Sequence, residues 1–398
     1  MNACNACGAT TFTPILDLGP LPVAHRFRRS PETEGEYRHP FAIHLCEDCG
    51  LVQIEDPIPP EDFYTDYNFC FSAWKSQPHM QVECDLLLKA VGGEERILEV
   101  GANDGTFLKV LGDAGFSKRV GVEPNPEAAE VARKTGATIH QGFFGPELAK
   151  TLHAEYGQFQ AIASRQTVEH IIDLQGLMEG LKLLLKPGGV FLIEVPDFEV
   201  AFDHGDPSLL WEEHVNYFGE AVLVSWLAKH GFVSERVERF PFCGGALMVL
   251  ARLDPERAAL ACTAEWKAKA KAFPAGVERS RKALQKVVET ERAAGRTSLI
   301  FGAGNRANLL INAFGMQSEF AFLVDDQPEK QGLYAPGTAM RVVSSEALQE
   351  NVGACFLAVN TENDASVQGR HSEWTGRFYS LCAPSAERLT WIEEALAE

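Results

Sequence analysis

The chain is short of positive charge and of long apolar stretches. Its 398 residues carry 36 Lys and Arg against 55 Asp and Glu, a formal net charge of −19. Such a surface repels a nucleic-acid backbone or an anionic membrane, so we expect neither as a partner. No stretch approaches the roughly 20 apolar residues of a membrane span, and the first residues, MNACNACGATTF, show no basic segment before an apolar core. We therefore expect a cytoplasmic protein.

Ten cysteines are present, and their spacing argues against a secreted disulfide scaffold. Four of them form two Cys-x-x-Cys pairs, Cys4 with Cys7 and Cys46 with Cys49, each followed by a glycine that lets the backbone turn. Four thiolates leave no open coordination position, which favours a structural zinc site. Four reduced cysteines without a metal are the alternative. The other six occur singly and are predicted to have no chemical role: Cys70, Cys84, Cys243, Cys262, Cys355 and Cys382.

Residues 97 to 125 read ILEVGANDGTFLKVLGDAGFSKRVGVEPN and predict a strand, a glycine-rich turn, a helix and a second strand ending on an acid. Gly101 and Gly105 allow the backbone to approach a ligand, and Glu123 can accept hydrogen bonds from both ribose hydroxyls. The spacing is not the dinucleotide pattern G-x-G-x-x-G, and acidic charge beside the turn would repel a pyrophosphate. The turn suits a ligand with a positive centre and resembles the first motif of class I S-adenosylmethionine (SAM) methyltransferases. A βαβ unit without a ligand is the alternative.

Helices and strands alternate from there to about residue 197, which predicts a doubly wound α/β sheet. A Lys-Pro-Gly-Gly turn is predicted at residues 186 to 189. Ligands in such sheets bind at the carboxyl ends of the strands. We expect eight residues there to form the SAM site: Glu99, Gly101, Asn103, Asp104, Gly105, Glu123, Pro124 and Gln166. Five aromatic residues before the sheet either line a pocket or dock the cysteine module: Tyr64, Tyr67, Phe69, Phe71 and Trp74.

Residues 254 to 294 are rich in Ala, Lys, Arg and Glu and predict one or two solvent-facing helices that connect two domains. A second strand, glycine turn and helix follow, and they predict a C-terminal Rossmann-like domain. Its turn, 302 to 307, nearly matches the dinucleotide spacing, and Arg306 would suit a phosphate; a structural turn is the alternative. Asp325 or Asp326 closes the next strand and could serve the ribose of NAD, the ribose of an acceptor's nucleotide, or a loop cap. The predicted division is a zinc-binding module (1–75), a SAM-binding methyltransferase domain (76–253), a helical connector (254–294) and a Rossmann-like domain (295–398).

Three blocks in this order resemble one family, the SAM-dependent sugar C-methyltransferases, which add a methyl branch beside the ketone of nucleotide-linked 4-keto deoxysugars. The first block is the double Cys-x-x-Cys module with LDLGPLPVAHRF, and the second is EVGANDG through GVEPN with SRQTVEHIID. The third is LLWEEHVNYF at 209 to 218, followed by FCGGALMVLAR, GAGNRANLLIN and VDDQPEKQGLYAPGT. The resemblance covers nearly the whole chain. It implies SAM and structural zinc as cofactors and a nucleotide-linked sugar as the small-molecule substrate.

Methylation of carbon requires removal of a proton beside a carbonyl group, and a neutral imidazole is a suitable base near pH 7. By resemblance, His214 is that base, Glu213 orients its ring or contacts a sugar hydroxyl, and His170 polarises or binds the ketone. Either histidine could instead be a hydrogen-bonded structural residue. Two positions depart from the family: Trp211 stands where a tyrosine is common, and FLAVNTEN lacks a tryptophan before its first asparagine. A role for a phenol at 211 is in doubt, and so are the contacts with the acceptor's nucleotide.

Two other functions fit parts of the pattern. An O- or N-methyltransferase for another small polar metabolite would use the same fold, with the histidine as a hydroxyl base. A non-enzymatic scaffold would retain SAM affinity without turnover, although the set of Glu99, Asp104, Glu123 and His214 favours an enzyme. The sequence identifies neither the sugar, nor its nucleotide, nor the oligomeric state.

Overall fold

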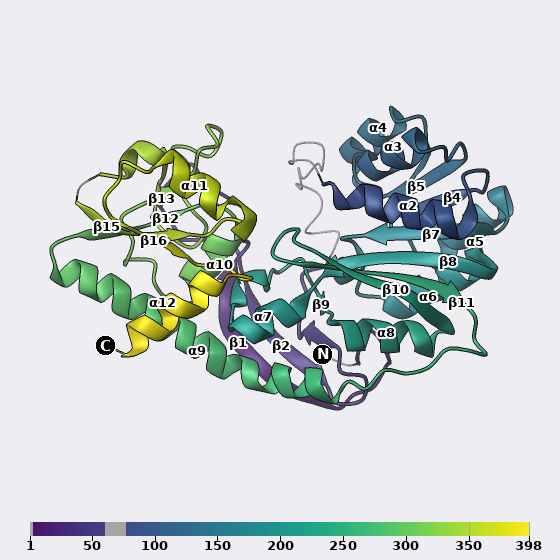
Figure 1. Ribbon diagram of the computed structural model, residues 1–398, viewed down its shortest axis with the longest axis horizontal. Helices are drawn as coiled ribbons and strands as arrows, with labels where there is room; N and C mark the ends of the chain where they lie inside the picture. Colours follow the sequence, from purple (N-terminus) through teal and green to yellow (C-terminus); the bar gives the residue numbers. More distant parts are fainter. Residues whose placement is uncertain (1–2, 60–76, 350, 398) are drawn as a thin grey trace.

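The computed structural model describes residues 3–59, 77–349 and 351–397. Within these residues the strands form three sheets, and two α/β units stand on either side of a gap crossed below by the N-terminal sheet and one long helix (Figure 1). The aromatic residues at 64 to 74 lie outside the described residues. Among the described residues, no helix combines the length and the apolar character that a membrane span needs.

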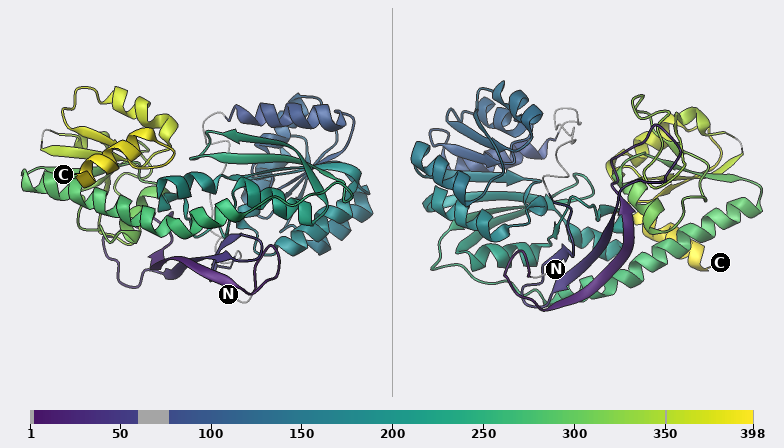
Figure 2. Two further views of the ribbon diagram at one scale, coloured as in Figure 1. Left: turned by 60° about the horizontal axis from the view of Figure 1, so that its bottom comes forward. Right: turned by 180° about the vertical axis from the view of Figure 1, so that it is seen from behind.

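The N-terminal sheet is antiparallel and has the order β1-β2-β3-β9. Its fourth strand comes from far along the chain, inside the block 209–218 that also contains His214. The β1–β2 hairpin is long and extends from the cysteine pairs toward the C-terminal unit (Figure 2). The bounds are β1 (Phe12–Pro22), β2 (Arg38–Cys46), β3 (Val52–Ile54) and β9 (Asn216–Tyr217).

The central sheet has seven strands in the order β10-β11-β8-β7-β4-β5-β6. All neighbouring pairs are parallel except those of β11, which is antiparallel to both β8 and β10. This is the doubly wound α/β sheet that the sequence predicts for a class I methyltransferase. The strands are β4 (Ile97–Val100), β5 (Arg119–Glu123), β6 (Thr138–Gln141), β7 (Phe159–Arg165), β8 (Leu185–Pro196), β10 (Phe232–Phe240) and β11 (Ala246–Leu253).

Alternating residues of these strands enter two separate cores. Ile97 packs with α2, α3 and α4, whereas Leu98 and Val100 pack with α5, α6 and α8 on the other face. Glu99 therefore points to the same face as Ile97. The helices and short 3₁₀ turns of this unit are α2 (His79–Val91), α3 (Thr106–Asp113), α4 (Pro126–Arg133), α5 (Pro146–Tyr156), η3 (Val168–His170), α6 (Leu174–Leu184), α7 (Phe198–His204), η4 (Pro207–Leu209) and α8 (Glu220–Lys229).

The C-terminal sheet is parallel throughout, with the order β14-β13-β12-β15-β16. Its strand order and parallel pairing agree with the predicted Rossmann-like domain. The elements are β12 (Thr297–Phe301), α10 (Asn305–Ala313), β13 (Leu323–Val324), β14 (Val342–Val343), η5 (Ser345–Ala347), β15 (Val352–Leu357), η6 (Thr361–Asn363), α11 (Asp364–Arg370), β16 (Arg377–Ser380) and α12 (Ala386–Ala397).

Two local predictions were wrong. The connector is one helix of 30 residues, α9 (Ala264–Ala293), and it buries one face, including Trp266 and Phe273, against α7 and α12. Its polar composition hid an apolar residue at roughly every helical turn. The expected turn at 186 to 189 lies inside β8, where the pairing with β7 shifts between Leu185 and Val190. The proline and glycines form a bulge there, because the strand continues beyond them.

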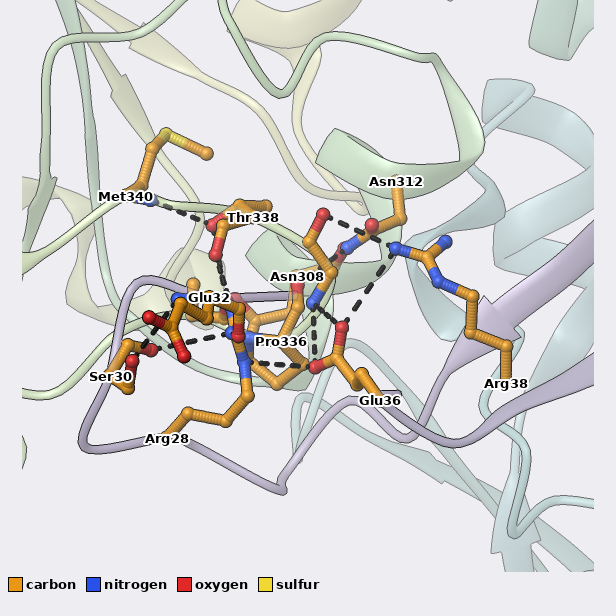
Figure 3. A network of polar contacts seen from close by, with 12 residues as sticks. Arg28, Ser30, Glu32, Glu36, Arg38, Asn308, Asn312, Pro336, Thr338 and Met340 are labelled. Atoms are coloured by element: carbon orange, nitrogen blue, oxygen red, sulfur yellow. Dashed lines mark hydrogen bonds and ion pairs between the residues drawn. The ribbon is translucent and has the colours of Figure 1, made fainter. Parts of the chain in front are cut away.

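The hairpin between β1 and β2 docks onto the C-terminal unit through charged and backbone groups (Figure 3). The Glu36 carboxylate accepts the N–H of Gly337 at 2.9 Å and lies 3.0 Å from Nε of Arg28. Arg28 also donates to the carbonyl groups of Ala335 and Thr338. We call the residues Arg28, Glu36 and 335–338 the hairpin clamp. It fixes the C-terminal unit relative to the N-terminal sheet.

Candidate active site

A cleft of about 1090 Å³ lies between the two α/β units. Its lining comes from the carboxyl ends of β4, β5 and β7, from residues 209 to 214, from the C-terminal glycine turn and from His25 of the N-terminal region. Ligands of doubly wound sheets bind at this edge. Pockets for one small molecule usually measure about 300–1,000 Å³, so this cleft is slightly larger than the usual range.

The glycine turn after β4 forms one end of the cleft. Gly101 has φ +78°, and an added Cβ would lie 2.1 Å from Oγ1 of Thr167, so only glycine fits. Asn103 also has a positive φ, +45°, and lines the cleft. The turn therefore brings bare backbone to the ligand edge of the sheet.

Glu123 is held at the end of β5 by two backbone groups. Its Oε2 accepts the N–H of Asn103 at 2.8 Å, and its Oε1 accepts the N–H of Asn125 at 2.9 Å. Burial raises the pKa of this carboxyl group, and the two hydrogen bonds oppose that rise. Each oxygen keeps a lone pair, and the side chain lines the cleft. The geometry suits two ribose hydroxyls.

Three of the eight predicted SAM residues stand behind the cleft wall. The Oδ1 atom of Asp104 accepts hydrogen bonds from the N–H and hydroxyl of Thr106, at 3.2 and 2.6 Å, at the start of α3. Gly105 has φ +79°, and a Cβ there would lie 2.9 Å from Cα of Ala132, so the glycine allows α3 and α4 to pack. Glu99 faces the α2 side of the sheet, where burial raises its pKa to about 8.

Among the described residues, the cleft lining contains the other five: Gly101, Asn103, Glu123, Pro124 and Gln166. Gln166 has φ +47°, and both its N–H and its Nε2 donate to Glu194. These residues fit the cofactor, because they combine exposed backbone at the glycine turn with the Glu123 carboxylate, which is hydrogen-bonded to that turn.

His214 lies in the middle of the cleft wall, 6% exposed, with its ring between two others. The ring centroids of Trp211 and His170 are 4.6 and 4.9 Å away. Burial and the nearby His170 lower the pKa of His214 well below its usual range, and a hydrogen bond to the Leu209 backbone opposes this effect. The imidazole is therefore neutral at pH 7 and can accept a proton.

His170 is fixed in one tautomer. Its Nδ1 lies 2.7 Å from the carbonyl oxygen of Glu213, and because a carbonyl can only accept, Nδ1 carries the hydrogen. Burial lowers the pKa of His170 to about 4. The ring is then neutral, and Nε2 holds a lone pair. His170 thus reaches the cleft as a hydrogen-bond acceptor.

Glu213 connects the histidines with the C-terminal unit. Its carbonyl group holds His170, and its Oε1 lies 3.4 Å from Nδ2 of Asn305 at the start of α10. The side chain is 6% exposed and lines the cleft. Both sides of the cleft therefore meet at this carboxylate.

Arg306 of the C-terminal glycine turn, for which a phosphate contact is one prediction, is engaged with protein groups in this structure. That side chain is buried and donates to Oγ of Ser208 and to the carbonyl of Ala383, both at 3.0 Å. Its guanidinium lies 3.5 Å from Asp206. Arg306 and Asp325 both line the cleft, and Asp325 accepts the N–H of Ala303. Arg306 is thus part of the interface with the central unit.

The four paired cysteines come together at the base of the N-terminal sheet. Sγ of Cys4 lies 3.6 Å from Sγ of Cys49, and Sγ of Cys7 lies 3.7 Å from Sγ of Cys46. A tetrahedral zinc ion with bonds near 2.3 Å separates its sulfurs by about 3.8 Å. The set fits a structural zinc ion, which leaves no position for a substrate.

Three family models match consecutive parts of the chain. A zinc binding domain matches residues 4–64, a methyltransferase domain matches 77–237, and a C-methyltransferase C-terminal domain matches 249–381. Their order is that of the cysteine cluster, the SAM cradle and the second glycine-turn unit. The chain belongs to the SAM-dependent C-methyltransferases. Its cofactors are SAM and structural zinc.

Two curated relatives are methyltransferases by name. This C-methyltransferase is 26% identical over 374 residues to C-methyltransferase NovU of Streptomyces niveus, covering 90% of this chain and 89% of that protein. Ubiquinone biosynthesis O-methyltransferase of Methylocella silvestris is 28% identical over 99 residues, 24% of this chain and 37% of that protein.

Solved structures match less than half of the chain. A SAM-dependent methyltransferase from Archaeoglobus fulgidus is 16% identical, with a TM-score of 0.37, and covers 44% of this chain and 94% of its own. One from Mesorhizobium loti is 17% identical, with a TM-score of 0.34, and covers 43% and 96%. At these scores they add nothing to the assignment.

Among the cleft residues that the sequence did not single out is Glu169. Glu169 is 1% exposed and lines the cleft beside His170. Its Oε1 lies 3.7 Å from Nε2 of His170. One carboxylate oxygen of Glu169 and one ring nitrogen each of His170 and His214 all lie within 4.8 Å of one another. Glu169 directly precedes His170 in the sequence, but nothing in that pair of letters shows that the carboxyl group is buried.

Proposed function

We propose that this C-methyltransferase adds a methyl group to the carbon beside the ketone of a nucleotide-linked keto-deoxysugar. His214 removes the proton from that carbon. The observation that carries the proposal is the neutral, buried imidazole of His214 in the wall of a cleft that has a SAM cradle at one end and a second glycine-turn unit at the other.

The acceptor end of the cleft suits a nucleotide. Lys330 and Arg370 line it in a chain whose net charge is −19, and both are placed by ion pairs, with Asp325 and Asp326 respectively. Cations in an otherwise acidic surface attract a diphosphate. Asp325 also accepts the N–H of Ala303, as a ribose-binding acid at the end of a second strand does.

The proposed roles follow from the contacts. When bound, SAM supplies a methyl group on positively charged sulfur, which is a good leaving group. His214 takes the proton and leaves an enolate on the sugar. Trp211 packs on the His214 ring and has its Nε1–H on the carbonyl of Ser208 at 2.7 Å, so it positions the base and exchanges no proton. Glu213 faces the sugar from between the histidines and Asn305.

The test is incubation with SAM and a panel of nucleotide-linked 4-keto deoxysugars, followed by mass spectrometry and carbon NMR. The expected product gains one methyl group bonded to carbon. A methoxy or N-methyl signal would instead support the second candidate, an O- or N-methyltransferase of another polar metabolite.

His214→Ala should abolish turnover while leaving SAM affinity nearly unchanged, because the side chain lines the cleft outside the glycine turn that is proposed to bind SAM. His230→Ala is the matched control, since that histidine is partly buried at the end of α8 and does not line the cleft. Equal loss of turnover and of SAM affinity in His214→Ala would show that the residue is structural.

A further inference from the structure

Proton removal beside a ketone places negative charge on the ketone oxygen, and that oxygen needs a hydrogen-bond donor. Three donors that the described residues place around His214 are already engaged. Nδ1–H of His170 binds the Glu213 carbonyl, Nε1–H of Trp211 binds the Ser208 carbonyl, and the Tyr217 hydroxyl donates to the Trp211 carbonyl at 3.3 Å. Because the hydrogen of the neutral His170 ring is on Nδ1, its Nε2 can only accept a hydrogen bond. Within the described part of the chain, none of these three donors is therefore available to the negative charge that develops on the ketone oxygen.

Glu169 has the right position and surroundings to fill this gap. Neither carboxyl oxygen makes a hydrogen bond of ordinary geometry to a described residue, although the side chain is 1% exposed. The 3.7 Å from Oε1 to Nε2 of His170 is also too long for a hydrogen bond. A buried ionised carboxylate in this state would carry a large desolvation cost, whereas a neutral acid would not.

The electrostatic surroundings support the neutral form. Burial raises the pKa of Glu169 well above its usual range, and the negative charges of Glu194 and Glu213 add to the rise. The amides of Glu169 and Thr167 favour the charged form but do not outweigh burial. The other groups facing this side chain, His170 and His214, are neutral, so neither supplies a compensating positive charge.

We propose that Glu169 is a catalytic residue that stays protonated and donates its O–H to the acceptor's ketone oxygen as the enolate forms. This inference rests on the proposed function. His214 accepts the carbon-bound proton, and the electron pair of that C–H bond becomes the enolate. The Glu169 proton remains on its carboxyl group and stabilises the new charge. The enolate carbon then takes the methyl group, the electron pair of the broken carbon–sulfur bond stays on sulfur, and His214 releases its proton to solvent.

The key measurement is deuterium exchange from solvent into the acceptor carbon, followed by NMR without SAM. Glu169→Leu should slow exchange by about 10²–10³-fold, as loss of an oxyanion donor does. Glu169→Gln keeps an N–H donor, and its loss should be on the order of 10-fold. The acceptor's KM should change little, because the hydrogen bond strengthens only as charge develops. Asp364→Asn is the control, since it removes a buried carboxyl group that does not line the cleft.

Two further readouts separate this role from a structural one. The infrared difference between the free wild type and Glu169→Gln should contain a protonated carboxyl band. In the wild type, kcat/KM should fall as pH rises through the raised pKa of Glu169, because the acid form is lost. Glu169→Gln should remove that alkaline fall, since His170 and His214 titrate on the acid side.

The outcomes are distinct for the two proposals. A folded Glu169→Leu variant with wild-type exchange, an absent carboxyl band, or an unchanged alkaline limb in Glu169→Gln would each overturn the role of Glu169. If the wild type exchanges no proton of any keto sugar in the panel, the proposed function fails, whereas the carboxyl band of the free enzyme still reports on Glu169.

Discussion

Gly101, in the glycine turn proposed to bind SAM, is constrained by a neighbouring side chain. Gly101 is required because a Cβ would meet Thr167 at 2.1 Å, and Thr167 lies on the loop that continues to Glu169 and His170. The cradle and the proposed proton-handling loop are therefore in direct contact at one glycine. A change at this position would affect both.

Gly101→Ala should lower both the free energy of unfolding and SAM affinity. An alanine with positive φ costs about 1–2 kcal/mol, and forcing it against Thr167 adds about 1–3 kcal/mol. Gly315→Ala is the matched control, because Gly315 has φ +67° with no atom within 4 Å of an added Cβ. Urea unfolding and calorimetry measure the two effects. Equal destabilisation in both variants would show that the contact with Thr167 is unimportant.

The sequence predicted the residues whose chemistry stands out and missed those whose role comes from their surroundings. Paired cysteines, glycine turns and the acid ending β5 are visible as patterns, and the structure brings them to the expected places. Asp104 is predicted at the ligand, but it lies just before α3 and does not line the cleft. Its carboxylate accepts a hydrogen bond from the hydroxyl group of Thr106. The proposed role of Glu169 depends on burial by distant segments, which no local pattern reports.

At the scale of elements, the short strand β9 joins three parts of the molecule. It pairs with β3, and its Asn216 accepts a hydrogen bond from the side chain of Asn5, between the first two cysteines, at 2.9 Å. The same Asn216 donates to the carbonyl of Ile171 at 2.7 Å, directly after the loop of Glu169 and His170. His214 lies two residues before it. Because β9 belongs to the N-terminal sheet, the predicted boundary at residue 75 separates two parts that share a strand; the four-part division stays a prediction.

Zinc removal should therefore impair methyl transfer before it impairs SAM binding. Cys46→Ser, or treatment with a strong chelator, should leave SAM affinity within about 3-fold of wild type. Turnover should fall by at least about 10-fold, because Asn216, two residues after His214, loses the support of Asn5; supporting hydrogen bonds around a functional site are worth about 10–100-fold. Metal content is followed by mass spectrometry and SAM binding by calorimetry.

Cys262→Ser serves as the control, since Cys262 is exposed and occurs singly. Full turnover in protein shown to contain no zinc would contradict the coupling through β9.

At the scale of the whole molecule, the cleft exists because two α/β units are held apart at a fixed distance. The hairpin clamp fixes the C-terminal unit from one side, and a buried cluster of Asp206, Arg306 and Arg388 fixes it from another. Arg388 also donates to Oγ of Ser280 on α9 at 2.8 Å. These contacts come from stretches that lie far apart in the sequence. They hold the C-terminal unit in a fixed position relative to the rest of the chain, and the cleft lies between the two α/β units.

Glu36→Gln should weaken the hairpin clamp and raise the acceptor's KM by on the order of 10-fold, because a hydrogen bond to a charged group contributes about 1.5–3 kcal/mol. SAM affinity should stay unchanged, since its cradle lies in the other unit. Steady-state kinetics and calorimetry measure both quantities. Glu32→Gln in the same loop is the control, because that residue is exposed. A parallel rise of KM in both variants would argue for a general charge effect.

The hairpin clamp has a consequence for engineering acceptor specificity by exchanging parts between relatives. A graft of residues 295–398 alone would bring a foreign partner for Arg28, Glu36 and Asp206, which all lie outside the grafted segment. Such a chimera would keep its donor chemistry and present a misaligned acceptor half. Specificity should transfer only when the loop 28–38 and residues 206–208 are exchanged together with the C-terminal unit, so the heritable block for acceptor choice is discontinuous in the sequence.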